Sequence, residues 1–269
     1  MDDTELLDVL SRGELEVVGR LVDASNATLL AVCTADGVSR RCVYKPVRGE
    51  RPLWDFPART LARREVAAYR LSAAAGWHVV PPTVLREGPH GPGSVQAWIE
   101  GADRDEAPEP GGGVIDVVAS DAVPPGWLRV IDAEGYDGSR VSLVHADDDE
   151  LRAMAVFDIV ADNADRKGGH VLREVDGRLR GVDHGLTFNT DPKLRTVLWG
   201  WAGRRIDAVT IEALARLGRE LDGALGGELA ELLSVPEADR TRERLGHLLS
   251  ARRFPRPGGH RPAIPWPAF

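Results

Sequence analysis

Two short polar segments in the middle of the chain carry residue types that can support phosphoryl transfer. The first, 162–170, contains Asp165 and, five residues later, His170, and the second, 181–188, contains Asp183. A turn sequence separates the two segments, which predicts a short hairpin between them. Phosphoryl transfer requires a carboxylate to orient the attacking hydroxyl and metal ligands to neutralise the phosphates. The two segments therefore hold the residue types that this chemistry requires, with Asp165 and His170 five residues apart and Asp183 beyond the predicted hairpin.

A cation and a partner for it precede these segments. Lys45 ends the apolar run Val-Tyr-Lys, which is typical of a strand, and Glu65 lies in a predicted helix. Leu61 and Tyr69 flank Glu65 at four residues on either side, so the carboxylate shares a helix face with apolar groups. A charge on such a face requires a partner, and we expect Lys45 to be that partner. The pair would hold the lysine against the phosphates of a nucleotide.

Together these residues resemble a known group of kinases. The Asn-Ala-Asp-Arg at 163–166 and the Val-Asp-His-Gly-Leu-Thr-Phe at 182–188 are similar to the catalytic and metal-binding segments of type II phosphatidylinositol 4-kinases and HipA-like protein kinases. The chain most resembles the actinobacterial phosphatidylinositol 3/4-kinase-like family, over roughly residues 15–235. The two polar segments are the specific part of the resemblance, and the N-terminal half matches by pattern only.

The resemblance implies a role for each matching residue and implies ATP as the phosphate donor, with Mg²⁺ or Mn²⁺. The implied catalytic residues are Asp165, Lys45, Glu65, Arg166 and Lys167, and the implied metal ligands are His170 and Asp183. A polar turn would cover the phosphates through its backbone N–H groups, and it comprises Ser25, Asn26, Ala27 and Thr28. The implied hinge, whose backbone meets the adenine, comprises Gln96, Ala97, Trp98 and Ile99.

The sequence departs from the family pattern at two places. His170 stands where the second metal ligand is usually Asn, and imidazole is a poor ligand for Mg²⁺. We therefore hypothesise that the second metal position is weak for Mg²⁺ or prefers Mn²⁺. The phosphate-covering turn also lacks a Gly-x-Gly-x-x-Gly motif.

The elements around these residues predict an α+β, bilobal, protein-kinase-like fold. Predicted strands at 15–22, 28–34, 40–46, 83–86 and 94–99, with helices at 5–12 and 58–75, form an N-terminal lobe over 1–100. Residues 101–126, rich in acid, Gly and Pro, are expected to form a loop or insertion near the hinge. A mainly helical lobe is expected over 127–253, with helices at 147–162, 206–222 and 236–252, followed by an extended Pro-rich tail over 254–269.

Composition narrows the classes of function. The chain has 269 residues, 43% of them hydrophobic and 28% charged, which is typical of a soluble globular protein. Its net charge of −8 disfavours nucleic acid as the main partner. An acidic N-terminus and no long apolar run predict a cytoplasmic protein without integral membrane contact, and we expect a monomer. Cys33 and Cys42 are expected to be a reduced pair near each other across a hairpin.

Taken singly, each site residue also has an ordinary interpretation: Lys45 as an edge-strand lysine, Glu65 as a solvated glutamate, and Asp183-His184-Gly185 as a turn. Their order along the chain favours a kinase. The first hypothesis is transfer to protein Ser/Thr hydroxyls, including its own. The alternatives are a phosphoinositide or other small-molecule kinase and an ATP-binding pseudokinase that acts as a regulatory module. Trp199 and Trp201 are candidates for an acceptor pocket or for core packing.

Overall fold

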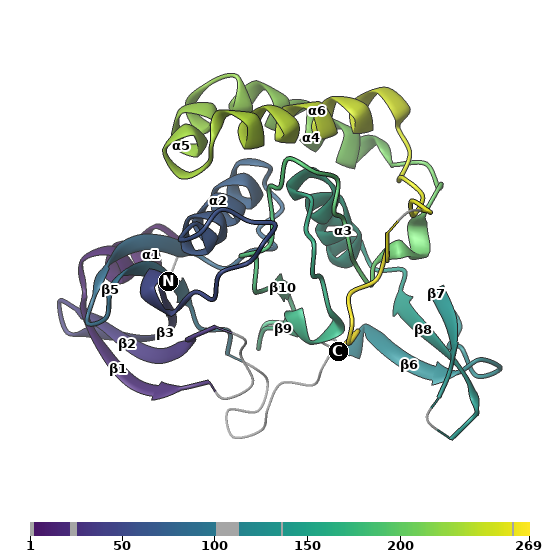
Figure 1. Cartoon of the computed structure of the whole chain (residues 1–269), viewed down its shortest axis with the longest axis horizontal. Coiled ribbons are helices and arrows are strands. Elements are labelled where there is room, and N and C mark those ends of the chain that lie inside the picture. Colours follow the sequence, from purple (N-terminus) through teal and green to yellow (C-terminus); the bar gives the residue numbers. More distant parts are fainter. Residues whose placement is uncertain (1–2, 22–25, 101–112, 136, 260) are drawn as a thin grey trace.

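A computed structural model describes residues 3–21, 26–100, 113–135, 137–259 and 261–269. The N-terminal half contains an antiparallel sheet with strand order β1-β2-β3-β5-β4 (Figure 1). Its elements are α1 (Asp3–Arg12), β1 (Glu14–Arg20), β2 (Leu29–Ala35), β3 (Val38–Pro46), α2 (Leu61–Ala74), β4 (Thr83–Gly88) and β5 (Gly91–Ala97). The five predicted strands and the two predicted helices of this half are confirmed to within a few residues.

The hairpin of β2 and β3 shows why this half folds as the sequence predicts. Asp36 and Gly37 both have positive φ, the conformation that a tight hairpin turn requires and that glycine adopts without steric cost. Alternate residues of the two strands point into a small apolar core, where Cys33 and Cys42 lie buried with their sulfur atoms 3.6 Å apart. Both are free cysteines, as expected.

The C-terminal half is mainly helical near the site. Its elements are α3 (Asp149–Ala161), β9 (Val171–Arg173), β10 (Leu179–Gly181), α4 (Ala208–Leu221), α5 (Ala224–Leu232) and α6 (Val235–Ala251). Asp148 caps α3 by accepting hydrogen bonds from the backbone of Glu150 and Leu151, and Ser234 and Glu237 form a capping box at the start of α6. The three predicted helices are confirmed, and α5 is an additional one.

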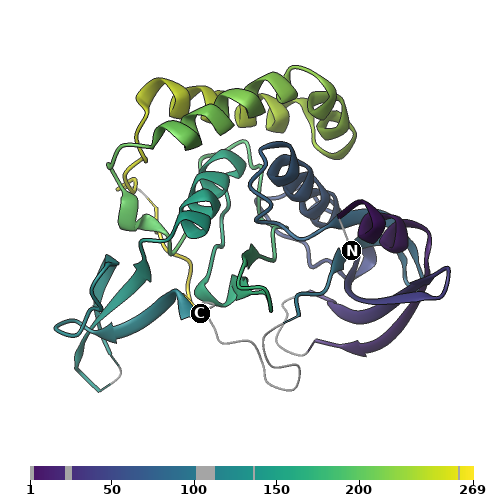
Figure 2. The same ribbon diagram turned by 180° about the vertical axis from the view of Figure 1, so that it is seen from behind.

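A second sheet was not predicted. Strands β6 (Ile115–Ala119), β7 (Trp127–Glu134) and β8 (Arg140–Ala146) form an antiparallel sheet in the order β6-β8-β7. This sheet lies at the end of the molecule opposite the N-terminal sheet (Figures 1 and 2). Strand β6 falls inside the range 101–126 that we expected to be a loop or insertion, and residues 101–112 of that range lie outside the described residues.

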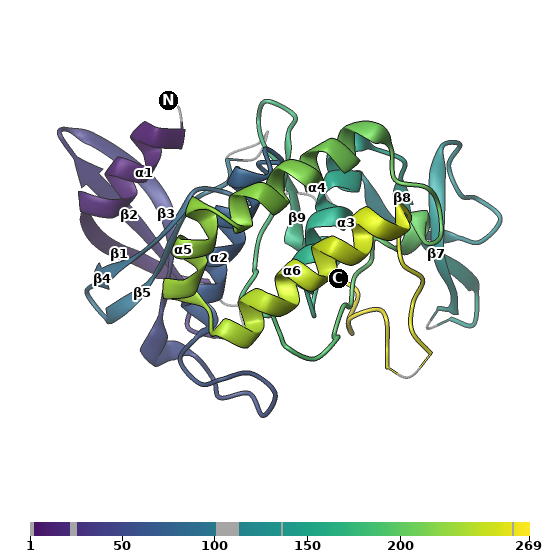
Figure 3. The same cartoon turned by 90° about the horizontal axis from the view of Figure 1, so that it is seen from above.

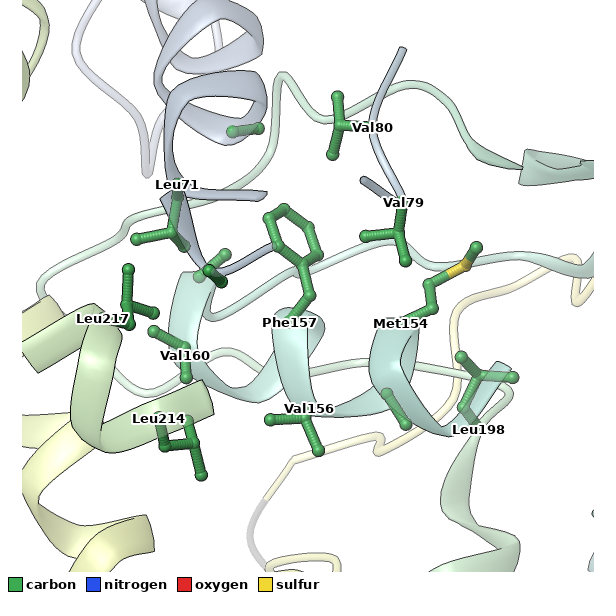
Figure 4. Close-up of a cluster of buried hydrophobic side chains, with 14 of the residues drawn as sticks. Leu71, Val79, Val80, Met154, Val156, Phe157, Val160, Leu198, Leu214 and Leu217 are labelled. Carbon is green, nitrogen blue, oxygen red and sulfur yellow. The ribbon is translucent and has the colours of Figure 1, made fainter. Parts of the chain in front are cut away.

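The helices α4, α5 and α6 form a layer over both halves, as the view from above shows (Figure 3). Beneath them, side chains of α2, α3 and α4 interlock in one apolar core that includes Leu71, Phe157 and Leu214, all fully buried (Figure 4). Buried Arg64 of α2 forms an ion pair with Glu237 of α6 and donates to the carbonyl of Thr187 at 2.5 Å. Helix α2 is therefore fixed against the C-terminal half.

The Pro-rich tail is extended and packs back onto the centre of the molecule. Phe254 is buried, and the Gly168 N–H donates to the carbonyl of Ala268 at 2.7 Å. The chain end at Phe269 consequently lies beside the segment that carries Asp165 (Figure 1).

Candidate active site

Lys45 connects the two halves of the molecule. It lies on β3, where the alternating pattern turns Tyr44 into the core and leaves Lys45 on the opposite face, one fifth exposed. Its ammonium group forms an ion pair with Glu65 and a second one with Asp183, whose Oδ1 lies 2.8 Å from Nζ. The structure therefore brings together the lysine, the helix glutamate and the predicted metal-binding aspartate.

Glu65 is held in place by both of its oxygen atoms. Its side chain is nearly fully buried on α2, and Oε2 accepts a hydrogen bond from the backbone N–H of His184 at 3.0 Å. The start of α2 is in turn capped by Glu50, which accepts from the N–H groups of Leu61 and Ala62. A carboxylate at a helix N-terminus also interacts favourably with the helix dipole.

Asp165 is presented by a tight turn after α3. Asp162 ends the helix in the left-handed conformation, with φ of +52°. Asn163 then uses both ends of its amide: its nitrogen donates to Asp158 at 2.9 Å, and its oxygen accepts from the N–H of Asp165 at 3.0 Å. The Asp165 carboxylate is about one quarter exposed, and Lys167 Nζ lies 3.5 Å from it.

Arg166 lies beneath the site instead of facing it. Its guanidinium is fully buried and donates to both oxygens of Asp158, at 3.0 Å from Nε to Oδ2 and 3.0 Å from Nη2 to Oδ1. It also donates to the carbonyls of His170 and Val182 and to Nε2 of His184, the last at 2.7 Å. Arg166 was predicted as catalytic, and its contacts instead make it a positioning residue that ties the two polar segments together.

Asp183 and His170 face each other across the hairpin. His170 Nε2 lies 3.6 Å from Asp183 Oδ2, and Asp183 has positive φ, +59°, a conformation that is uncommon for residues other than glycine. His184 points away into the core and meets Phe157 edge to face, with ring centroids 5.3 Å apart.

Electrostatics set the charge of each group. The positive charge of Lys45 lowers the pKa of Asp183 far below its ordinary value, so this carboxyl group is ionised. Burial opposes the charged form of Lys45, but the charges of Asp183 and Glu65 outweigh it and raise the lysine pKa. Burial lowers the pKa of His170 to about 4, so its imidazole is neutral at pH 7. Burial also raises the pKa of Asp165, against the opposing charge of Lys167, which makes that carboxylate a stronger base.

A cleft of about 340 Å³ lies between the two halves. The lining includes Lys45, Glu65, Asp165 and Asp183 and, from the predicted phosphate-covering turn, Asn26, Ala27 and Thr28. Ser25 of that turn lies outside the described residues.

The predicted hinge residues do not border this cleft. The N–H of Ala97 donates to the carbonyl of Pro82, and the N–H of Trp98 donates to the carbonyl of Arg41. The Gln96 amide donates to Thr83, and Ile99 is buried. Their contact with adenine stays a prediction, and the N–H groups of Ala97 and Trp98 are already occupied.

The donor atoms fit a metal ion that arrives with a phosphate ligand. Among the described residues, no group of three or more His, Cys, Asp and Glu side chains is placed to hold a metal by itself. Asp183 supplies a carboxylate that is 54% exposed, and neutral His170 lies beside it with its buried Nδ1 unpartnered within the described chain. One or two protein ligands, completed by substrate phosphates and water, suffice for Mg²⁺.

Sequence reasoning missed several residues that support the site. Asp158 is the acidic residue in the interior of an otherwise apolar buried helix, and that isolation was the available signal. Glu50 gave no signal, because its role depends on where a loop places it. The same loop is anchored by Asp55, which pairs with Lys193 at 2.8 Å and accepts from Asn189 at 2.8 Å. The two sides of the cleft are thus held together without a ligand.

Comparison with known proteins identifies the family to which the chain belongs. No protein-family model matches it. Protein Rv2133c of Mycobacterium tuberculosis is 50% identical over 263 residues, which span 97% of this chain and 94% of that protein. The chain belongs to the same family as Rv2133c.

Solved structures share the fold at low sequence identity. The crystal structure of the Golgi casein kinase with Mn/ADP bound has a TM-score of 0.55 and 14% identity, covering 93% of this chain and 75% of that one. The structure of hydra Fam20 with sugar also has a TM-score of 0.55, with 12% identity, covering 92% of this chain and 87% of that one. The predicted α+β, kinase-like fold is therefore confirmed. Within the described residues no helix has both the length and the apolar character needed to cross a membrane.

Proposed function

We propose that the protein is an atypical kinase that transfers the γ-phosphate of ATP to a hydroxyl group, most readily a protein Ser or Thr and including its own. The observation that carries the proposal is the arrangement of Lys45 between Glu65 and Asp183, with Asp165 lining the same cleft. A buried glutamate that holds a lysine beside a metal-binding aspartate is the arrangement that kinases need for the phosphates.

The chemistry assigns one task to each residue. Asp165 orients the acceptor hydroxyl and takes its proton. As the acceptor oxygen bonds to the γ-phosphorus, the bond between that phosphorus and the β–γ bridging oxygen breaks, and ADP leaves. Lys45 binds the α- and β-phosphates while Glu65 holds it in place, and Lys167 lies near enough to Asp165 to neutralise charge on the transferred group. Asp183 and His170 would hold a divalent metal, which neutralises phosphate charge when bound.

ATP with Mg²⁺ or Mn²⁺ is the proposed donor system. The Golgi casein kinase, which shares this fold, was solved with Mn/ADP bound, and this supports a nucleotide and a divalent metal here. His170 in place of an oxygen ligand favours Mn²⁺, since Mn²⁺ accepts nitrogen ligands more readily than Mg²⁺. The phosphatidylinositol 3/4-kinase-like subtype, a cytoplasmic location and a monomeric state remain part of the proposal. The residues at 163–166 and 182–188 support the subtype, and the composition supports the location.

The test is transfer of label from γ-labelled ATP to the protein with Mg²⁺ or Mn²⁺. Wild type should become labelled, Asp183→Asn should not, and Asp176→Asn, the same change in an exposed turn, should behave like wild type. Equal labelling of wild type and Asp183→Asn would refute the role of the cleft. Nucleotide binding without labelling of any polypeptide would redirect the proposal to a small-molecule acceptor or to a pseudokinase.

A further inference from the structure

A second groove, of about 340 Å³, lies between the segment that follows Asp183 and the C-terminal tail. One side is formed by residues 192–195 and Trp199, and the other by residues of the range 255–263. The carbonyl of Ala263, on the tail side, joins the two sides. It accepts hydrogen bonds from the N–H of Thr196 at 3.0 Å and from the indole of Trp199 at 2.8 Å. The groove is therefore a preformed part of the fold.

The groove is basic in a chain of net charge −8. Arg195, Arg256 and Arg261 border it, and within the described chain the side chains of these three arginines have no hydrogen-bonded or ion-paired carboxylate. Lys193, which also borders the groove, is buried and already paired with Asp55. Three uncompensated guanidinium groups around one concavity attract carboxylates, which they can bind in a bidentate manner.

Arg195 connects this groove to the catalytic segment. Its N–H donates to the carbonyl of Asn163 at 2.9 Å, and its own carbonyl accepts from the N–H of Arg166 at 3.0 Å. Its side chain is partly exposed, its Nε is buried without a partner among the described residues, and its positive charge acts on Asp165. Arg195 therefore borders the groove and also lies next to the segment that carries Asp165.

We propose that this basic groove docks a carboxylate-rich segment of a polypeptide acceptor, with the hydroxyl to be phosphorylated placed at Asp165. The inference rests on the proposed function and specifies its substrate class. The concave shape fits an extended chain, whereas a bilayer surface requires flat or protruding basic and apolar groups. Phe254, the aromatic residue of the basic run at 252–256, is buried and therefore cannot insert into lipid.

Peptide binding without nucleotide tests the docking independently of catalysis. The probe is a fluorescent peptide in which one serine is flanked by glutamates, compared with its glutamine counterpart. Wild type should bind the glutamate peptide more tightly. An R256Q/R261Q double variant should bind it about tenfold more weakly, because two charge-assisted contacts are lost. The control R240Q/R242Q removes the same charge from helix positions, exposed at Arg240 and half-buried at Arg242, that already have acidic partners, and it should bind like wild type.

Several results would overturn the docking proposal. One is equal affinity of wild type for the two peptides, and another is a loss of affinity in the control variant equal to that in the double variant. A third is that Arg256 and Arg261 are required for binding anionic phospholipid vesicles but not for binding the peptide. Failure of the proposed function looks different: docking would still depend on charge, but wild type would transfer no phosphate to the bound peptide. If both hold, the double variant should raise KM for the glutamate peptide about tenfold and leave kcat unchanged.

Discussion

Replacing Asp158 by asparagine should destabilise the protein and disturb Asp165 at a distance. Asp158 and Arg166 are both fully buried, and the carboxylate accepts from Nε and Nη2 of Arg166 and from the amide of Asn163. It also accepts from the hydroxyl of Thr196 at 3.3 Å. Asparagine keeps the volume but removes the charge and turns an NH₂ group toward these donors.

The size of the effect follows from the burial of the guanidinium group. Removing one partner of a buried ion pair typically costs about 3–5 kcal/mol, because the remaining charge is left uncompensated. A smaller value is expected only if water can reach Arg166, and its zero exposure argues against that. We therefore expect the free energy of unfolding to fall by about 3 kcal/mol or more.

Urea unfolding followed by tryptophan fluorescence at pH 7 measures this change, since the chain has 7 tryptophans. Asp239→Asn is the matched control: it breaks an exposed pair with Arg242 and should cost less than about 1 kcal/mol. Phosphate transfer by Asp158→Asn should also fall while it is still folded, because Arg166 joins the two polar segments. A loss of stability no larger than that of the control would refute the assignment of this network as the support of the site.

Three further predictions concern other parts of the molecule. Lys45→Met should reduce phosphate transfer by about a hundredfold or more and weaken ATP binding measured by calorimetry, because a preorganised cation on the phosphates is lost. Burial lowers the pKa of His145 to about 4, below its unfolded value of about 6.5, so the folded state binds fewer protons between these values. Titration of His145 alone should therefore lower the free energy of unfolding by about 3 kcal/mol as the pH drops from about 6.5 to about 4, and His145→Gln should remove that part of the slope. In Gly168→Ala the new methyl group would overlap the ring of Phe269, whereas Gly169→Ala meets nothing within 4 Å. Backbone hydrogen exchange in the tail should therefore be faster than in wild type for Gly168→Ala and unchanged for Gly169→Ala.

Most of the N-terminal half and the order of the site residues could be predicted from the sequence. The pairing of Lys45 with Glu65 followed from one charged residue on an apolar helix face, and the structure contains that pair. Two runs of strand-forming residues joined by an Asp-Gly turn were sufficient to predict the β2–β3 hairpin, because the contacts of a hairpin are local in the sequence.

The parts that were missed depend on contacts between distant segments. Strand β6 pairs with β8, so that Ile115 faces His145, and a short strand within a Gly- and Pro-rich range carries no local signal. Arg166 was assigned to catalysis through the family resemblance at 163–166, but the direction of its side chain is determined by its contacts with Asp158 and His184. The basic groove arises only when the tail packs back on Trp199.

The most direct test of the account compares two quantities for Asp165→Asn and wild type in the same buffer: the affinity for ATP and the rate of γ-phosphate transfer. Asp165 is assigned to the acceptor hydroxyl and not to the nucleotide. The account therefore predicts that the affinity changes by less than about threefold while the rate falls by about 10²-fold or more. An unchanged transfer rate, or the absence of ATP binding by wild type with either Mg²⁺ or Mn²⁺, would contradict it.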